Sequence, residues 1–192
     1  YCVLYNDTKV NNIQQQIKDY EQRYHHNFNA VRLIAVSKTQ NVQAIQEALA
    51  AGQYEFGENY CQEALAKIAL INHPQIKWHF IGNIQSNKTK SIAEHFSWVH
   101  TVDRLKIARL LNQHRPCDYS PLNICIQVNI SNEITKSGVT INEIEPLCAA
   151  FNHFPNLKLR GLMIIPKKNE GTLADQRKPF RQLKQIFDKL NH

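Results

Sequence analysis

Apolar runs of four to eight residues alternate with helix-periodic segments from about residue 31 to the end of the chain. No other feature limits the possible folds of these 192 residues so strongly. The runs have the length of buried strands, and strands that alternate with helices predict an α/β fold with a parallel sheet. The expected strands are 32–36, 54–57, 78–82, 98–102, 123–129 and 158–165.

The segments between these runs are expected to be helices that begin near residues able to cap a helix. The expected starts are Asn41, Asn59, Asn87, Asp103 and Asn142. A separate amphipathic helix, beginning near Asp7 or Thr8, should precede the first strand and pack outside the main core. The last helix is indicated by the apolar residues Phe180, Leu183, Phe187 and Leu190.

Two architectures fit this alternation: a doubly wound open sheet and a (β/α)8 barrel. No G-x-G-x-x-G sequence follows the first strand, which disfavours a dinucleotide-binding sheet. A barrel has eight strands and usually about 250 residues, so six expected strands fall two short. The chain also stops in or just after a helix, with no closing strand.

Composition excludes several classes of protein. With 43% hydrophobic and 20% charged residues, the chain can form one globular core and is neither disordered nor a coiled coil. The net charge of +7 favours an anionic partner, but scattered Lys and Arg predict a solvated basic surface more than nucleic-acid binding. No apolar run is long enough for a membrane span. Five cysteines without a C-x-x-C pair predict reduced thiols, a cytoplasmic location and no metal site.

Polar residues stand where the expected strands end, which is where α/β folds bind ligands. The residues to inspect are Ser37, Lys38, Thr39, Gly57, Glu58, Asn59, His79, Gly82, Asn83, Gln85, Gln127, Asn129, Lys136, Gly161, Leu162 and Met163. They contain neither the carboxylate pair of a glycosidase nor a serine–histidine–acid set.

A lysine at the end of a buried strand has a particular chemical use. Desolvation favours the neutral amine, which can attack an aldehyde and form a Schiff base, most often with pyridoxal phosphate. The structural alternatives stay open: Lys38 as a solvated side chain, His79 as a core histidine, Asn59 as a helix cap and Met163 as core packing.

Five segments resemble, in order and spacing, the pyridoxal phosphate homeostasis proteins of the YggS/PROSC family. These segments are LIAVSKT, FGENY, WHFIGNIQSNK, IQVNISNEITKSG and RGLMIIP, and the match runs from about residue 31 to 165. The resemblance implies a (β/α)8 TIM-type barrel, like the barrel domain of alanine racemase, that stands alone as a single domain over 1–192 with an extra N-terminal helix.

The resemblance also implies the cofactor and its site. Lys38 would carry pyridoxal 5′-phosphate as a Schiff base, with Asn59, His79, Asn129 and Met163 lining the same mouth. Lys136 is a second candidate amine near the entrance. The family pattern continues with a phosphate-binding loop and an arginine near the pyridine nitrogen, and neither segment appears here. We therefore expect the C-terminal strands to be missing from this chain.

The expected function is to hold and buffer pyridoxal phosphate, and to supply it to apo-enzymes, without substrate turnover. A racemase of this fold needs a second domain that supplies another acid or base, for which this chain has no room. The alternative is a racemase or decarboxylase that uses the same cofactor. We expect a monomer that binds neither nucleic acid nor membranes.

Overall fold

A computed structural model describes residues 2–3, 7–131, 137–166 and 171–190. Its contacts divide the chain into two compact units, residues 1–82 and 83–192, and each is described by itself. The expectation of a single domain over 1–192 stays a prediction. Lys136 lies outside the described residues.

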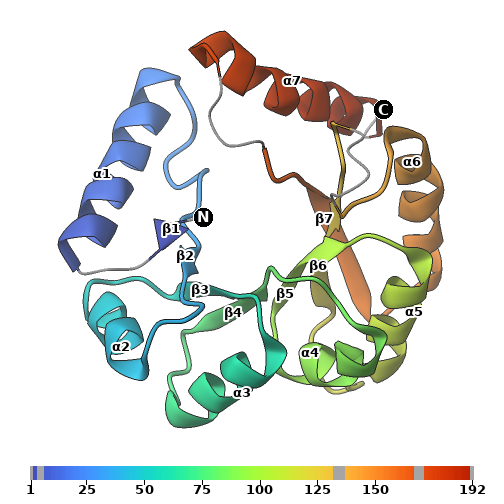
Figure 1. The fold of residues 1–192 in the computed structure, drawn as a ribbon, viewed down its shortest axis with the longest axis horizontal. Coiled ribbons are helices and arrows are strands. Elements are labelled where there is room, and N and C mark those ends of the chain that lie inside the picture. Colours follow the sequence, from blue (N-terminus) through green and yellow to red (C-terminus); the bar gives the residue numbers. More distant parts are fainter. Residues whose placement is uncertain (1, 4–6, 132–136, 167–170, 191–192) are drawn as a thin grey trace. The chain divides into compact units, whose positions relative to one another are not determined.

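The first unit is a parallel array of four short strands. The strands are β1 (Cys2–Val3), β2 (Ala35–Val36), β3 (Glu55–Glu58) and β4 (Lys77–Phe80), and they pair in sequence order. The helices of this unit are α1 (Asp7–Arg23), α2 (Val42–Ala50) and α3 (Cys61–Leu70), and α2 and α3 lie on one side of the strands (Figure 1). All three adjacent pairs run in parallel, so their carboxyl ends lie at one edge.

The two faces of β3 have different roles. Phe56 and Glu58 lie on the face toward α3, where Glu58 contacts Lys67 of that helix. Gly57 lies on the opposite face, because a Cβ atom there would come within 3.0 Å of Ile81 and 3.2 Å of Ile34. The helix-side face is the core of the unit, and its buried residues include Ala35, Ile45, Ala48, Phe56, Ala64, Trp78 and Phe80.

The second unit has three longer parallel strands: β5 (Trp98–Val102), β6 (Leu122–Gln127) and β7 (Leu157–Met163). Its helices are η1 (Ser86–Lys88), α4 (Thr89–His95), α5 (Leu105–His114), α6 (Ile141–Ala150), η2 (Phe151–His153) and α7 (Leu173–Leu190). Its core includes Ile92, Phe96, Val99, Ile107, Leu111, Leu122, Ile124, Ile126 and Ile144, all nearly inaccessible to solvent.

The predicted α/β fold with parallel strands is confirmed, and each of the six predicted runs contains a strand. One strand was not predicted: β1 spans two residues before α1, so the first helix does not precede every strand. The described residues thus hold seven strands, fewer than the eight of a closed (β/α)8 barrel. The run 32–36 is a strand only at its last two residues.

Helices begin within two residues of all five predicted starts, but most of the predicted residues are not the caps. Asn41 caps α2 as expected, since its side chain accepts a hydrogen bond from Ala44 N at 2.9 Å. Asn59 is not a cap, because α3 begins two residues later. Asn87 lies inside η1, and Asp103 stands two residues before α5. The cap of α6 is Thr140, whose hydroxyl forms a reciprocal capping box with Glu143.

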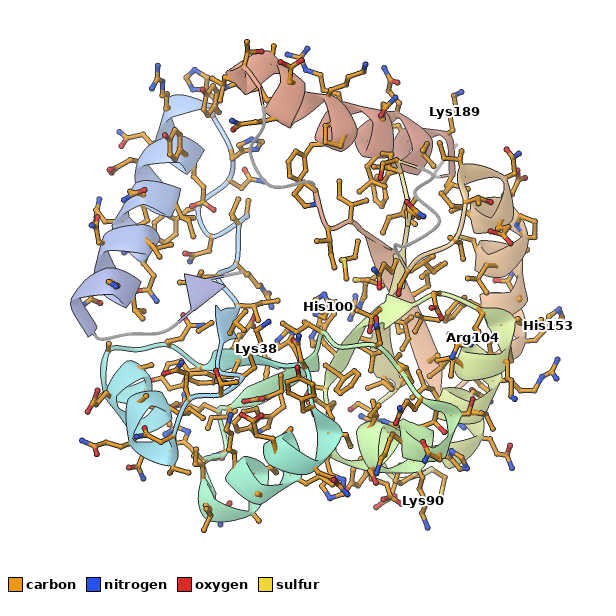
Figure 2. The ribbon with its side chains drawn as sticks, in the orientation of Figure 1. Lys38, Lys90, His100, Arg104, His153 and Lys189 are labelled. Atoms are coloured by element: carbon orange, nitrogen blue, oxygen red, sulfur yellow. The ribbon has the colours of Figure 1, made fainter. Side chains whose placement is uncertain are left out.

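His100 of β5 makes the stability of the second unit sensitive to acid. Its ring is buried, stacks on Trp98 at 5.7 Å between ring centroids, and is labelled in Figure 2. Burial lowers the pKa of His100 from 6.5 to about 4, because the interior disfavours the charged ring. The unfolded chain therefore binds a proton that the folded chain excludes between these two pH values.

We predict that this histidine contributes stability that is fully present above pH 6.5 and is lost as the pH falls toward 4. Between pH 7 and pH 4.5 the loss from this group should be about 2 kcal/mol. Urea unfolding of His100→Asn should show a pH dependence reduced by that amount. The matched variant of the exposed His153, His153→Asn, should keep the original dependence. An unchanged dependence in His100→Asn would contradict the prediction.

Candidate functional site

Lys38 lies in a tight turn directly after β2 (Figure 2). The turn is closed by a hydrogen bond of 3.0 Å from Gln40 N to the carbonyl of Ser37. Thr39 has a φ of 61°, a left-handed conformation that is uncommon for residues other than glycine. The Lys38 side chain is half-buried, and within the described part of the chain its ammonium has no hydrogen-bond or ion-pair partner. The Lys38 amine is thus held at a strand end and forms no hydrogen bond or ion pair with another described group.

A buried polar cluster lies on the helix side of this turn. Ser37 Oγ donates to Glu58 Oε1 at 2.6 Å, and Lys67 Nζ donates to the same oxygen at 2.7 Å. Lys67 also donates to the Ser37 carbonyl at 2.7 Å. All three residues are buried, with Ser37 and Glu58 fully inaccessible. The cluster therefore joins β2, β3 and α3 at the point where Lys38 leaves the sheet.

The cluster continues to the other side of Lys38. Lys67 donates to Glu63 Oε1 at 2.6 Å, one turn earlier in α3, and the same oxygen accepts the backbone N–H of Thr39 at 2.6 Å. Although desolvation acts in the opposite direction, the hydrogen bonds from Lys67 and Thr39 lower the pKa of Glu63. Glu63 is therefore a stable anion in the turn.

Glu58 is the most deeply buried member of the cluster. Burial raises the pKa of its carboxyl group, and the hydrogen bonds from Lys67 and Ser37 offset this effect only in part. Its second oxygen, Oε2, has no hydrogen-bond partner within the described residues. Removing one member of a buried ion pair usually costs about 3–5 kcal/mol, because the other charge is left uncompensated.

Asn59 ends β3 at the same edge as Lys38, because Val36 and Gly57 are register partners in adjacent parallel strands. Alternation along β3 turns Asn59 away from α3, to the face that carries Gly57. Its Oδ1 atom is buried and has no hydrogen-bond partner within the described residues. Gly82 packs tightly behind it, since a Cβ atom at Gly82 would lie 2.0 Å from the Asn59 carbonyl oxygen. An amide acceptor is thus fixed and available beside the lysine.

His79 lies on the same face as Gly57, its register partner, but its ring is directed to the start of the strands. Its Nε2 is 3.7 Å from Glu55 Oε2, at the amino end of β3, whereas Lys38 follows the carboxyl end of β2. The imidazole is 3% exposed. This position fits the alternative of a structural core histidine, and contact between His79 and a cofactor stays a prediction.

In the second unit, Asn129 follows β6 in a rigid backbone turn. Its N–H donates to the carbonyl of Val139 at 2.9 Å, and Val139 N donates to the carbonyl of Gln127 at 2.9 Å. Gly138 makes this pairing possible: its φ is 124°, and a Cβ atom would lie 2.7 Å from Asn129 N. Asn129 and Gln127 line a hollow of about 260 Å³ together with Ser131 and Ser137. Gln127 Oε1 is buried there without a partner in the described chain.

Met163 ends β7 and is the register partner of Gln127. Its carbonyl accepts the N–H of Val128 at 2.8 Å, so its backbone supports the turn that leads to Asn129. The side chain is buried, which also fits the alternative of core packing. Its contact with a cofactor stays a prediction.

Sequence reasoning noted Glu58 and Gly82 as strand-end residues but gave them no role, and it missed Lys67. The signal for Glu58 was a carboxylate directly after the expected strand 54–57. Lys67 gave no comparable signal, because a lysine in a helix usually reaches solvent. Within the described residues no three His, Cys, Asp or Glu side chains form a metal-binding group, and no helix could span a membrane.

Comparison with known sequences matches residues 9–192 to the family described as alanine racemase, N-terminal domain. A pyridoxal phosphate homeostasis protein of Pseudomonas aeruginosa is 52% identical over 161 residues, which cover 84% of this chain and 70% of that protein. A protein of the same name from Haemophilus influenzae is 46% identical over 183 residues, covering 94% of this chain and 77% of the relative.

Solved structures show the same fold. PipY of Synechococcus elongatus, in a structure with PLP bound, is 33% identical with a TM-score of 0.77, over 89% of this chain and 79% of PipY. An alanine racemase of Clostridium difficile has a TM-score of 0.70 over 94% of this chain and 48% of the enzyme. At 11% identity, this second likeness shows the fold alone.

We predict that Gly82→Ala displaces Asn59. A methyl group cannot approach a carbonyl oxygen to 2.0 Å, so the end of β3 must shift, at a cost of about 1–3 kcal/mol in unfolding free energy. The shift should appear in the NMR chemical shifts of the amides of residues 58–60. Gly52→Ala is the control: its φ of 83° strains an alanine, but nothing lies within 4 Å of the added atom. Equal chemical-shift changes at residues 58–60 in both variants would refute this packing role.

Proposed function

Because the chain belongs to the alanine racemase N-terminal domain family, we propose that it binds pyridoxal 5′-phosphate through Lys38 and acts as a homeostasis protein for this cofactor. It would hold the cofactor reversibly, keep the free aldehyde scarce and release it to apo-enzymes that need it. We propose that it does so as a cytoplasmic monomer. The names of its relatives and the PLP-bound PipY structure support this function.

The observation that carries the proposal is the uncommitted amine of Lys38 at the carboxyl end of β2. Bound pyridoxal phosphate supplies an aldehyde that forms a Schiff base with a primary amine. Lys38 has the properties that this bond requires: it is half-buried, its backbone is fixed on both sides, and no described group occupies its nitrogen. By contrast, Lys67 is already bonded to three oxygens.

The neighbouring groups fit such a ligand. Asn59 Oδ1 is a buried acceptor with no partner in the described chain, and a buried acceptor of this kind normally has one. A hydroxyl or amine of a bound molecule would satisfy it. The close packing of Gly82 against the Asn59 backbone holds this acceptor in place. In the second unit, Gln127 Oε1 is a comparable acceptor in the hollow beside Asn129.

A carrier role fits these residues better than turnover. Racemisation needs a second acid or base besides the Schiff-base lysine, positioned to exchange a proton with the substrate. Asn59, at the same strand-end edge as Lys38, and Thr39, the next residue in the turn, carry amide and hydroxyl groups that bind and orient but do not titrate near neutral pH, and the carboxylate of Glu63 is already bonded to Thr39 N and Lys67. The likeness to alanine racemase extends to the fold and supplies no such residue.

We predict that Lys38→Ala abolishes covalent binding of pyridoxal phosphate and leaves the fold intact, because the side chain makes no polar contact within the described residues. Absorption spectra with added cofactor should lose the band of the lysine adduct, while the circular dichroism spectrum stays unchanged. Lys90→Ala is the control, since Lys90 is an exposed lysine paired with Glu94 on α4.

A yellow adduct retained by the Lys38→Ala variant would refute the assignment. The carrier role is tested separately by incubating the wild-type protein and the cofactor with amino acids in heavy water. We expect no exchange of the α-proton above the rate given by free cofactor. Sustained exchange that depends on Lys38 would identify a racemase or decarboxylase instead.

A further inference from the structure

One buried ammonium, that of Lys67, reaches the backbone on both sides of Lys38. It donates directly to the carbonyl of Ser37, the residue before Lys38, at 2.7 Å. It also donates to Glu63, whose carboxylate accepts the N–H of Thr39, the residue after Lys38, with both distances at 2.6 Å. The peptide groups that flank Lys38 are therefore held from a single point on α3.

Packing alone does not account for a charged residue at this place. Apart from Ser37 and Glu58, the helix-side face of β2, β3 and β4 carries apolar side chains such as Ala35, Phe56 and Trp78, which are in register across the three strands. Lys67 and Glu58 bring two charges into this layer, and Glu58 leaves one oxygen unpaired. Apolar residues of similar size would usually give equal or greater stability at such a site. The ion pair thus has a purpose other than core stability.

The turn around Lys38 needs support, and the cluster provides it. Thr39 adopts a left-handed conformation that costs energy in a residue other than glycine. The hydrogen bond from its N–H to Glu63 fixes this conformation. Glu63 is in turn fixed by Lys67, four residues later on the same helix.

Lys67 cannot take part in the chemistry itself. Ser37 faces α3, where its hydroxyl bonds to Glu58, whereas the Lys38 side chain makes no polar contact with this cluster within the described residues. The Lys67 side chain is only 7% exposed and its described contacts are all on the helix side. Any effect of Lys67 on the amine must therefore pass through the backbone.

We propose that Lys67, together with Glu58 and Glu63, is a positioning group that fixes the backbone on both sides of Lys38 and so aims its amine at the cofactor aldehyde. This inference rests on the proposed function of Lys38. A misplacement of the order of 1 Å in a reacting group can slow a reaction up to about a hundredfold, so a fixed backbone affects adduct formation directly.

The test uses two variants of the full chain and one matched control. In Glu58→Met/Lys67→Met both charges are replaced together, so that no unpaired charge is buried and the chain stays folded. In Glu63→Ala the link between Lys67 and Thr39 is cut, at a side chain that is already 31% exposed, while the bonds from Lys67 to Ser37 and Glu58 remain. The control is Arg115→Met: Arg115 is also buried and donates to the carbonyls of Ala93, Phe96 and Ser120, but it lies in the second unit.

Two measurements are made on each protein: hydrogen exchange of a peptide covering residues 37–40, and the rate and absorption maximum of adduct formation with pyridoxal phosphate. We expect faster exchange in both variants. Adduct formation should slow about tenfold or more in the double variant, less in Glu63→Ala, and the band should shift. Arg115→Met should destabilise the protein while leaving the exchange of this peptide and the adduct unchanged.

The outcomes separate the inference from the function on which it rests. Wild-type exchange and wild-type adduct kinetics in a folded double variant would overturn the positioning role while leaving Lys38 as the Schiff-base lysine. Equal slowing in Arg115→Met would also overturn it, by showing a general effect of lost stability. If the wild-type protein forms no adduct, the proposed function fails, and the positioning of the cofactor amine is overturned with it, even if the exchange data show that the cluster fixes the turn.

Discussion

The rest of the first unit depends on one constraint, the parallel pairing of β2 with β3. Helix α3 packs against one face of this pair. Parallel strands end at one edge, so Lys38 and Asn59 become neighbours although 21 residues separate them in the chain. Alternation then sends Ser37 and Glu58 to the helix and Asn59 to the other face, while Lys38, in the turn after β2, makes no polar contact with the helix-side cluster within the described residues. One short ladder thus separates a structural ion pair from a candidate binding surface.

This separation gives two neighbouring lysines of the first unit different surroundings. Lys67 is surrounded by acceptors and fixed, whereas Lys38 has a fixed backbone and an uncommitted amine. The same principle recurs in the second unit, where Gly138 lets the backbone close around Asn129 and leaves the Gln127 amide oxygen available. In both units hydrogen bonds hold the backbone in place, and the polar atoms without a partner in the described chain are at the ends of side chains.

Much of the fold could be predicted from the sequence, because buried parallel strands are continuous apolar runs and all six predicted runs contain one. β1 could not be predicted, since two residues are too short to show a pattern. Helices begin within two residues of Asn59, Asn87 and Asp103, as predicted, but none of these residues is the cap, because a suitable residue type does not fix where the chain turns. Thr140, and not Asn142, caps α6. Its hydroxyl is hydrogen-bonded to Glu143, a partner that composition alone does not single out.

The positions of Lys38 and Asn59 directly after buried strands could be predicted from the sequence, whereas the burial of Lys67 could not, and contact of these residues with a cofactor stays a prediction. Nothing in the residues around Lys67 indicates that its charge lies inside the protein. His79 shows the opposite case: its strand was predicted, but the direction of its ring toward Glu55 is known only from the structure.

The most direct test of the central claim is to add pyridoxal phosphate to the wild-type protein, reduce with borohydride and map the modified peptide by mass spectrometry. We predict a single reduced adduct at Lys38, and an adduct at another lysine, or at none, would contradict the account.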